Sequence, residues 1–273
     1  MHKAWLRSGI LALSLTGLAV TACAEEIAVA AASDLSFVLP ELAARFERET
    51  GHTLKFTFGS SGNFFSQIQN GAPFDLFFSA DRDYPERLEA AGLVEPGTLY
   101  PYATGRIVLW APRGSRLDLS RGLRVLLDQG IGRIAIANPR HAPYGRAAVT
   151  ALERAKIYNE VQRKLVFGEN ISQAAQFVES GNADIGILAL SLVVAPPMKD
   201  KGRYVEIPAD AHPAIEQACV VLKSSPHKPT ARLFLDYLKR PETRALLARY
   251  GFTVPEETVA PPTREKTPTK EKP

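Results

Sequence analysis

Cysteine is scarce in this sequence, which contains only Cys23 and Cys219 among 273 residues. Two cysteines cannot build the disulfide framework on which small exported domains depend. The fold must therefore rest on a hydrophobic core, and about 250 residues suffice for one large domain or for two lobes. Cys219 lies in an apolar segment, where we expect a buried and unreactive thiol.

Long apolar runs are scarce as well. The run near the N-terminus, residues 10–20, is too short to span a bilayer as a helix of the mature protein. It follows the basic residues Lys3 and Arg7 and precedes several small residues, a pattern typical of a secretory signal peptide. We predict a signal peptide over residues 1–24 and an exported protein.

Two processing sites compete within this leader. Ala22 and Ala24 form an A-x-A cleavage site before Glu25, whereas "VTAC", which ends at Cys23, resembles a loose lipoprotein signal. We expect a soluble periplasmic protein, with a lipid anchor on Cys23 as the alternative.

A strong excess of one charge sign is also missing. The chain has 33 basic and 29 acidic residues, and removing Lys3 and Arg7 leaves 31 against 29, a net charge of +2. This balance gives no reason to expect nucleic acid or an anionic membrane as a partner. Residues 256–273 are rich in Pro, Lys, Glu and Thr with almost nothing apolar, and we predict that they are disordered.

What the chain does contain is an alternation of apolar runs and helical patterns. Each of "IAVAAAS", "TLKFTF" and "FDLFFSA" is followed by an amphipathic segment, which is typical of βα repeats on a mainly parallel sheet. The first of these segments is expected to be a helix that stops at Gly51. One face of it carries Leu35, Leu39, Leu42 and Phe46.

A second set of alternating segments begins after Gly105, and the strand "AIEQACVVL" then precedes two helical segments. This order indicates a chain that returns to its first lobe. We predict an α/β, two-lobed periplasmic-binding-protein architecture with two mainly parallel sheets, flanking helices and a ligand cleft between the lobes. The expected first lobe comprises residues 25–104 and 223–255, and the second comprises 105–222.

Small and hydroxyl residues recur where the predicted strands end and helices begin. The four junctions are Ser33 after "AVAAA", Ser60 and Ser61 after "FTFG", "APYG" at 142–145, and "GENIS" at 168–172. Helix starts offer backbone N–H groups without intrahelical partners and a partial positive charge. Four such junctions around one cleft would suit an oxyanion.

A secreted serine hydrolase is the alternative from another functional class. Asn63 stands where the nucleophile motif G-x-S-x-G needs a glycine, and none of the five histidines lies in a catalytic motif, although spatial proximity to a serine stays open. No lysine follows the glycines as in a phosphate-binding loop, and no close Cys/His pattern indicates a metal site. We expect no catalytic residue and no cofactor.

The same residues also have plain structural interpretations. Serine at the positions of Ser33 and Ser61 usually caps a helix, and Asp34 suits a cap or a turn. Tyr144 and Ile171 are, taken alone, ordinary packing residues. The local pattern does not choose between these interpretations and a binding site.

The order and spacing of several motifs are more specific. The segments "AAASDLSFVLPELAARFERETG", "FTFGSSGNFFSQIQNGAPFDLFFSAD", "NPRHAPYGRAA" and "GENISQAAQFVESGNADIGI" resemble the periplasmic molybdate-binding proteins of ABC importers, over nearly all of residues 27–254. The resemblance implies a monomeric binding protein that captures molybdate or tungstate between its lobes and delivers it to a membrane permease. Sulfate and phosphate are the alternative ligands.

The resemblance also implies ligand-binding residues. Ser33 and Ser61 match the family's hydroxyl donors, while Tyr144 and Ile171 match its backbone donors. Molybdenum would be bound only as the oxyanion, with no protein atom coordinated to the metal. Asp34 would turn its carboxylate away as a cap or turn partner and offer at most its backbone N–H.

Ala189 departs from the family pattern. Many members carry at this position a tyrosine whose hydroxyl binds the oxyanion. We hypothesise that the Tyr144 hydroxyl supplies the missing donor.

Overall fold

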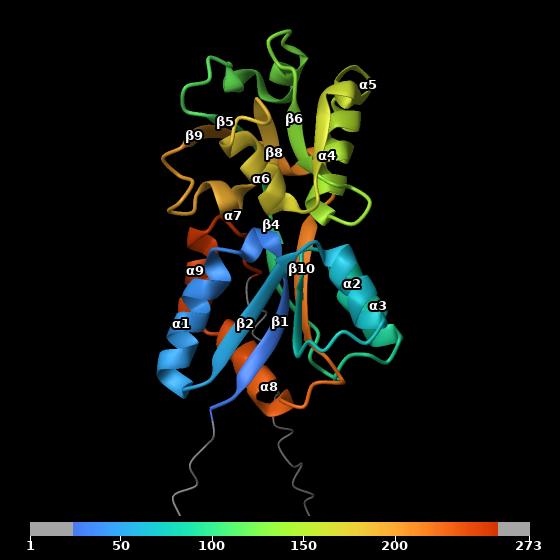
Figure 1. The fold of residues 1–273 in the computed structure, drawn as a ribbon, viewed down its shortest axis with the longest axis vertical. Coiled ribbons are helices and arrows are strands. Elements are labelled where there is room, and N and C mark those ends of the chain that lie inside the picture. The colour runs from blue at the N-terminus through green and yellow to red at the C-terminus, as the bar shows by residue number, and fades with distance from the viewer. Residues whose placement is uncertain (1–23, 256–273) are drawn as a thin grey trace, which may run out of the picture.

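Two five-stranded sheets form the framework of the computed structural model, which describes residues 24–255 (Figure 1). The first sheet has the strand order β2 (Thr53–Gly59), β1 (Glu26–Ala32), β3 (Leu76–Ser79), β10 (Ile215–Val221), β4 (Tyr100–Gly105). The second has the order β7 (Leu165–Gly168), β6 (Ile134–Ala137), β8 (Ile185–Ala189), β5 (Ile107–Pro112), β9 (Gly202–Glu206). We call the parts built on them the first and the second lobe.

The sheets have the same plan. β1 is parallel to β2 and β3, and β6 is parallel to β7 and β8. Only β10 in the first sheet and β5 in the second run against their neighbours on both sides. The predicted pair of mainly parallel sheets is therefore confirmed. Because the carboxyl ends of parallel strands share one edge, the loops that follow them gather at that edge.

Helices cover both faces of the first sheet. α1 (Val38–Thr50), α8 (Lys228–Leu238) and α9 (Pro241–Arg249) pack on one face, and α2 (Ser61–Gln69) and α3 (Asp83–Ala90) pack on the other (Figure 1). The predicted apolar face of α1 is buried, and the helix ends at Gly51, whose φ of 78° is left-handed. The 3₁₀ turn η1 (Ser33–Leu35) precedes α1.

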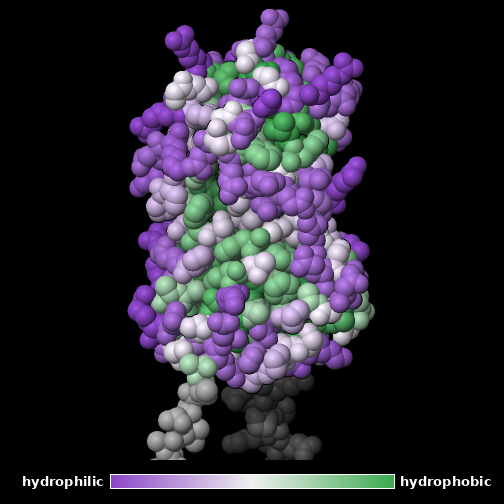
Figure 2. Space-filling model, viewed as in Figure 1, coloured by the Kyte–Doolittle hydropathy of each residue, from purple (hydrophilic) through white to green (hydrophobic). Residues whose placement is uncertain are grey.

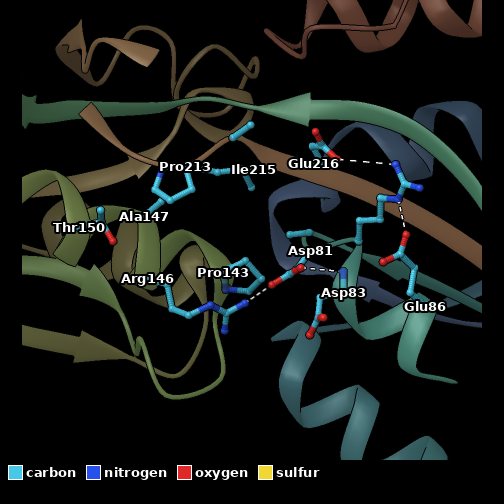
Figure 3. Close-up of a pocket in the computed structure, with 13 residues that line it drawn as sticks. Asp81, Asp83, Glu86, Pro143, Arg146, Ala147, Thr150, Pro213, Ile215 and Glu216 are labelled. Atoms are coloured by element: carbon cyan, nitrogen blue, oxygen red, sulfur yellow. Dashed lines mark hydrogen bonds and ion pairs between the residues drawn. The ribbon is translucent and has the colours of Figure 1, made fainter. Parts of the chain in front are cut away.

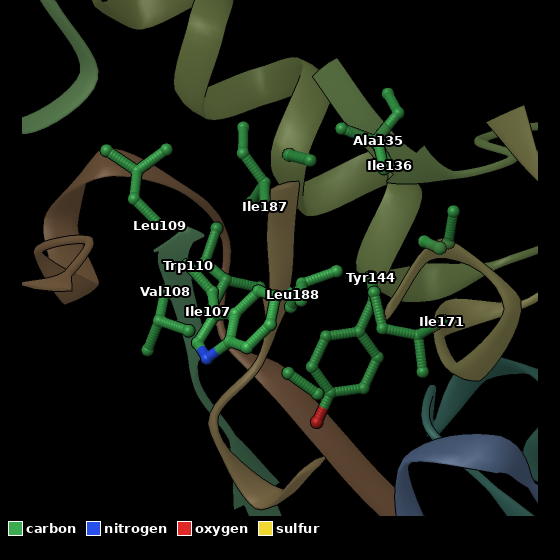
Figure 4. Close-up of a cluster of buried hydrophobic side chains, with 14 of the residues drawn as sticks. Ile107, Val108, Leu109, Trp110, Ala135, Ile136, Tyr144, Ile171, Ile187 and Leu188 are labelled. Atoms are coloured by element: carbon green, nitrogen blue, oxygen red, sulfur yellow. The ribbon is translucent and has the colours of Figure 1, made fainter. Parts of the chain in front are cut away.

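The second lobe has its own apolar core, in which Trp110, Leu188 and Tyr144 are buried (Figure 4). The two helices that begin at the predicted junctions are α4 (Pro143–Arg154) and α6 (Ile171–Glu179). The shorter elements are η2 (Leu119–Leu127), α5 (Tyr158–Val161), η3 (Gln162–Lys164), α7 (Leu190–Val193) and η4 (Ala209–Ala211).

Between residues 24 and 255, the chain crosses between the lobes twice, once from β4 to β5 and once from β9 to β10. The second crossing corrects the predicted boundary at residues 222/223. β10 pairs with β3 and β4 in the first sheet, so the chain has already returned by Ile215. An apolar strand carries no local sign of the sheet it will join, because that choice depends on long-range pairing.

The predicted signal peptide, the lipid-anchor alternative at Cys23 and the predicted disordered tail lie outside residues 24–255. Within the described part of the chain, no helix has the length and apolar character needed to cross a membrane. Polar residues cover much of the face in Figure 2, with an apolar area on the first lobe around β2. Leu54, Phe56 and Phe58 of that strand are partly buried against the first-lobe core.

Candidate ligand-binding site

The four predicted junctions meet at one small cavity between the lobes. The four predicted site residues, Ser33, Ser61, Tyr144 and Ile171, all line it and are nearly fully buried. The other lining residues are Ala32, Asp34, Gly59, Ser60, Ala80, Ala142, Pro143 and Asn170. Residues from distant parts of the chain are thus brought together by the shared edge of each sheet.

Ser61 presents a hydroxyl group to this cavity. It is the first residue of α2, and the capping position before it belongs to Ser60. The capping interpretation of Ser61 is therefore wrong. Its Oγ accepts a hydrogen bond from the Ala80 N–H at 2.9 Å, and within residues 24–255 its own proton has no recorded acceptor. The hydroxyl is oriented by Ala80 and can donate to a ligand.

Ser33 connects the two lobes. Its Oγ donates to Asn170 Oδ1 at 3.1 Å and accepts from the Ser172 N–H at 3.3 Å, and both partners belong to the second lobe. Ser33 is the first residue of η1 and follows the cap position at Ala32, so it is not a helix cap either. The Ser33 hydroxyl can therefore donate to an anion only if its hydrogen bond to Asn170 Oδ1 breaks.

The second lobe contributes the starts of two helices. Pro143 is the first residue of α4 and has no N–H, so Tyr144 carries the first donor of that helix. In α6 the N–H groups of Ser172 and Gln173 bond to Ser33 Oγ and Asn170 Oδ1, which leaves the Ile171 N–H as the first donor. Helix dipoles add partial positive charge at both positions.

Two glycines allow the close approach that this geometry needs. A Cβ atom on Gly145 would lie 2.2 Å from the carbonyl oxygen of Ala137, so only glycine lets α4 start against β6. A Cβ atom on Gly62 would lie 2.8 Å from the carbonyl oxygen of His141. The Gly62 N–H donates to that same oxygen at 2.9 Å and joins the lobes beside the cavity.

Asp34 behaves differently from the prediction. Its side chain caps no helix and is 1% exposed. Its Oδ2 accepts hydrogen bonds from the Tyr144 hydroxyl at 2.9 Å and from Gln217 Nε2 at 2.7 Å. Burial raises the pKa of Asp34 to about 6, although interactions with Gln217, with Tyr144 and with its own backbone N–H favour the ionised form and oppose the shift. The expected cap or turn role is therefore wrong.

The Tyr144 hydroxyl is also not the replacement donor that we hypothesised for Ala189. It donates its one proton to Asp34 and accepts from Gln217 Nε2 at 3.0 Å. The ring lies in the second-lobe core, and a Cβ atom on Gly105, where β4 ends, would be 2.2 Å from its oxygen (Figure 4). What Tyr144 retains for a ligand is its backbone N–H.

Ser60 and His141 form a contact that the sequence did not reveal. Ser60 Oγ lies 2.8 Å from His141 Nδ1, and His141 Nε2 lies 3.5 Å from Glu169 Oε1. The serine and the histidine are 81 residues apart, so no motif spacing could have paired them. A serine, a histidine and a carboxylate in contact are also the parts of a nucleophilic triad.

A larger pocket of about 570 Å³ lies between Asp81 of the first lobe and Arg146 of α4 (Figure 3). Arg146 pairs with Asp81, and Arg82 pairs with Glu86 and Glu216. The lining contains four carboxylates, Asp81, Asp83, Glu86 and Glu216, against these two arginines. Its arginines are thus already paired within an acidic lining, which disfavours a dianion.

No group of three or more His, Cys, Asp or Glu side chains between residues 24 and 255 is arranged to hold a metal ion.

A family model described as "bacterial extracellular solute-binding protein" matches residues 27–253. The chain belongs to this family.

Two curated relatives of this solute-binding protein are named molybdate-binding protein ModA. The one from Rhodobacter capsulatus is 38% identical over 248 residues, which are 90% of this chain and 96% of the relative. The one from Azotobacter vinelandii is 39% identical over 243 residues, 89% of this chain and 96% of the relative. The solved structure titled Azotobacter vinelandii periplasmic molybdate-binding protein matches with a TM-score of 0.80 and 34% identity, covering 84% of this chain and all of that one.

These relationships confirm the two-lobed fold and the resemblance to periplasmic molybdate-binding proteins. The family and its named relatives are binding proteins and not enzymes, so the serine hydrolase alternative is wrong. Ser60 and His141 accordingly form a link between the lobes beside the cavity.

Proposed function

We propose that this protein captures molybdate or tungstate between its lobes and delivers it to the membrane permease of an ABC importer. The observation that carries the proposal is the convergence of four buried junctions, two with hydroxyls and two with helix-start N–H groups, on one cavity. The names of the relatives supply the identity of the anion.

The proposed donors are neutral. They are the hydroxyls of Ser33 and Ser61 and the backbone N–H groups of Tyr144 and Ile171, with the Asp34 N–H as a further backbone donor. Oriented dipoles can replace the water shell of a tetrahedral dianion without a countercharge in contact, because the site excludes bulk solvent. The molybdenum atom would contact no protein atom.

Selectivity would follow from size. Donors spaced for the longer metal–oxygen bonds of molybdate would hold sulfate or phosphate loosely and leave donors without full hydrogen bonds. Molybdate and tungstate are nearly equal in size, so this criterion does not separate them.

The proposal also places the protein outside the cytoplasm as a monomer. Membership in an extracellular solute-binding family supports export. Soluble release after residue 24 is the favoured form, and attachment through a lipid on Cys23 is the alternative. Mass spectrometry of the mature protein would separate the two by the first residue and by the mass of a lipid.

A thermal-shift comparison tests the function. Molybdate and tungstate should raise the melting temperature, because a ligand that binds only the folded form shifts the unfolding equilibrium. Sulfate and phosphate at the same concentration should have little effect. Equal shifts with sulfate would contradict the selectivity, and no shift with any tetrahedral oxyanion would contradict the function itself.

A further inference from the structure

Asp34 is the one carboxylate among the residues that line the cavity. One of its oxygens, Oδ2, has two hydrogen-bond partners. The other, Oδ1, is buried and has no partner within the described residues. An unpaired buried carboxylate oxygen beside an anion site is costly, because it neither receives a hydrogen bond nor meets a cation.

The hydrogen bonds around the Asp34 side chain determine which of its two carboxylate oxygens has no partner. The Tyr102 hydroxyl donates to Gln217 Oε1 at 2.7 Å, so the Gln217 Nε2 group points to Asp34 and Tyr144. The Tyr144 hydroxyl accepts from Gln217 and therefore donates to Asp34. Both side-chain donors to Asp34 are therefore directed at Oδ2, which leaves Oδ1 without a partner in a residue that lines the cavity.

Within residues 24–255, no cation acts on the Asp34 carboxyl group. Its titratable neighbours are Tyr144 on α4 and Tyr102 on β4, which are both buried, and burial raises the pKa of each hydroxyl well above its ordinary value. Cys219 on β10 lies near Tyr102, and burial raises the pKa of its thiol too. All three groups are therefore neutral near pH 7.

The other elements packed against η1 are β2, α6 and α7. Their recorded hydrogen bonds to the η1 residues Ser33 and Asp34 come from Ser172 and Ser191, whose hydroxyls donate to the carbonyl oxygens of Ser33 and Asp34. Neither serine titrates in this range. Asp34 is thus the carboxyl group in the cavity lining, and His141, which contacts Ser60 Oγ, is the other titratable group beside the cavity.

We propose that anion binding is coupled to the uptake of one proton by Asp34, which holds it on Oδ1 and donates it to an oxygen of the bound tetrahedral oxyanion. This inference rests on the proposed function. The proton comes from solvent, and it converts a repulsive pair of anions into a hydrogen bond. Asp34 would then provide the donor that Ala189 lacks.

The coupling has a defined pH dependence. Burial already brings the pKa of Asp34 to about 6, and a dianion beside it must raise the value further. Below that pH the carboxyl group is neutral before the ligand arrives, and affinity should be constant. Above it, each binding event must first protonate Asp34, so affinity should fall about tenfold per pH unit.

Calorimetric titration of the full chain with sodium molybdate tests this inference. At about pH 7.5, titrations in buffers of different ionisation enthalpy should give a heat that varies with the buffer and corresponds to uptake of about one proton. This measurement needs no variant. Buffer-independent heats together with a Kd that does not change between about pH 5.5 and 8.5 would overturn the proton coupling alone.

The Asp34→Asn variant sharpens the test, because asparagine imitates the protonated acid. Its carbonyl oxygen can accept from Tyr144 and Gln217, and its amide group can donate where Oδ1–H would. Molybdate should bind to this variant with one affinity across the pH range and without proton uptake. Persistent proton uptake by Asp34→Asn would assign the proton to another group and overturn the inference.

The matched control is Asp75→Asn, which removes a second buried carboxylate far from the cavity. Asp75 accepts from the Ala28 N–H and the Ser225 hydroxyl in the first lobe. The control should keep the full proton uptake. If wild-type protein gives no heat with molybdate, sulfate or phosphate at any of these pH values, the proposed function fails and this inference fails with it.

Discussion

The two lobes equip the cavity in different ways. The first lobe brings side-chain hydroxyls, Ser33 and Ser61, and the one carboxyl group, Asp34. The second lobe brings the backbone N–H groups of Tyr144 and Ile171 at helix starts. Side-chain substitutions can therefore test the first-lobe half of the site. The second-lobe donors are backbone N–H groups, which only a substitution by proline removes.

Proline at position 171 is the change that should break the second half. Ile171 is the first residue of α6 and follows Asn170 in an extended conformation, with φ −148° and ψ 178°, so proline fits the backbone there. Proline removes the N–H and also replaces a buried side chain. Loss of one donor to a buried dianion should weaken molybdate binding by ~3 kcal/mol, about a hundredfold.

The control for this variant is Ile171→Val, which keeps the N–H and removes one methylene group from a buried side chain. Calorimetry should show near-normal affinity for Ile171→Val. Equal losses in both variants would mean that the side chain matters and the backbone donor does not.

The Asp34 carboxyl group should make the free energy of unfolding depend on pH. The folded-state pKa of Asp34 is raised from 3.8 to about 6, so its contribution is fully present below about pH 4 and is lost as pH rises through about 6. The loss amounts to at most ~3 kcal/mol. Asp34→Asn should therefore gain stability relative to wild type as pH rises from 4 to 8, measured by urea unfolding. A constant difference between the two proteins would contradict the raised pKa.

Ser61→Ala should show the larger effect of the two serine substitutions. Its hydroxyl proton is free of other acceptors in the described structure, and removing it should weaken molybdate binding by about 2 kcal/mol, or roughly thirtyfold. Ser33→Ala should cost less affinity, because the Ser33 hydroxyl must first leave Asn170. The reverse ranking in calorimetry would show that Ser33 carries the main hydroxyl contact.

Tyr144→Phe should have the smallest effect on affinity. The hydroxyl supports Asp34 and not the ligand, so its removal should leave molybdate binding nearly unchanged at about pH 5.5. Unfolding measurements should instead show a loss of about 1 kcal/mol that is larger at pH 8, where Asp34 is ionised, than at pH 5. A tenfold loss of molybdate affinity at low pH would instead show that the Tyr144 hydroxyl donates to the ligand.

Much of this site was predictable because it is built from local patterns. A strand followed by small residues and a helix start marks the four junctions, and the family resemblance selects Ser33, Ser61, Tyr144 and Ile171 within them. One shared sheet edge in each lobe brings these residues to one cavity, and their role as ligand donors stays a prediction. The pairing register of the strands and the boundary between the lobes were harder to predict from the sequence. β10 joins the first sheet through pairings such as Val220 with Phe77, which no local pattern announces.

The roles of individual polar groups were the least predictable. Asp34 and Gln217 are 183 residues apart, and Ser33 and Asn170 are 137 apart. Whether an aspartate caps a turn or is buried against a tyrosine depends on such distant partners. The incorrect expectations for the Asp34 carboxylate and the Tyr144 hydroxyl both concern the contact between these two groups.

The most direct test of the account is an anomalous difference map from crystals grown with molybdate or tungstate, recorded at the absorption edge of the metal. We expect a single strong peak between the lobes, with ligand oxygens at hydrogen-bond distance from the Ser61 hydroxyl and from the Tyr144 and Ile171 N–H groups. A peak in the Arg146 pocket, or no peak from protein saturated with either anion, would contradict it.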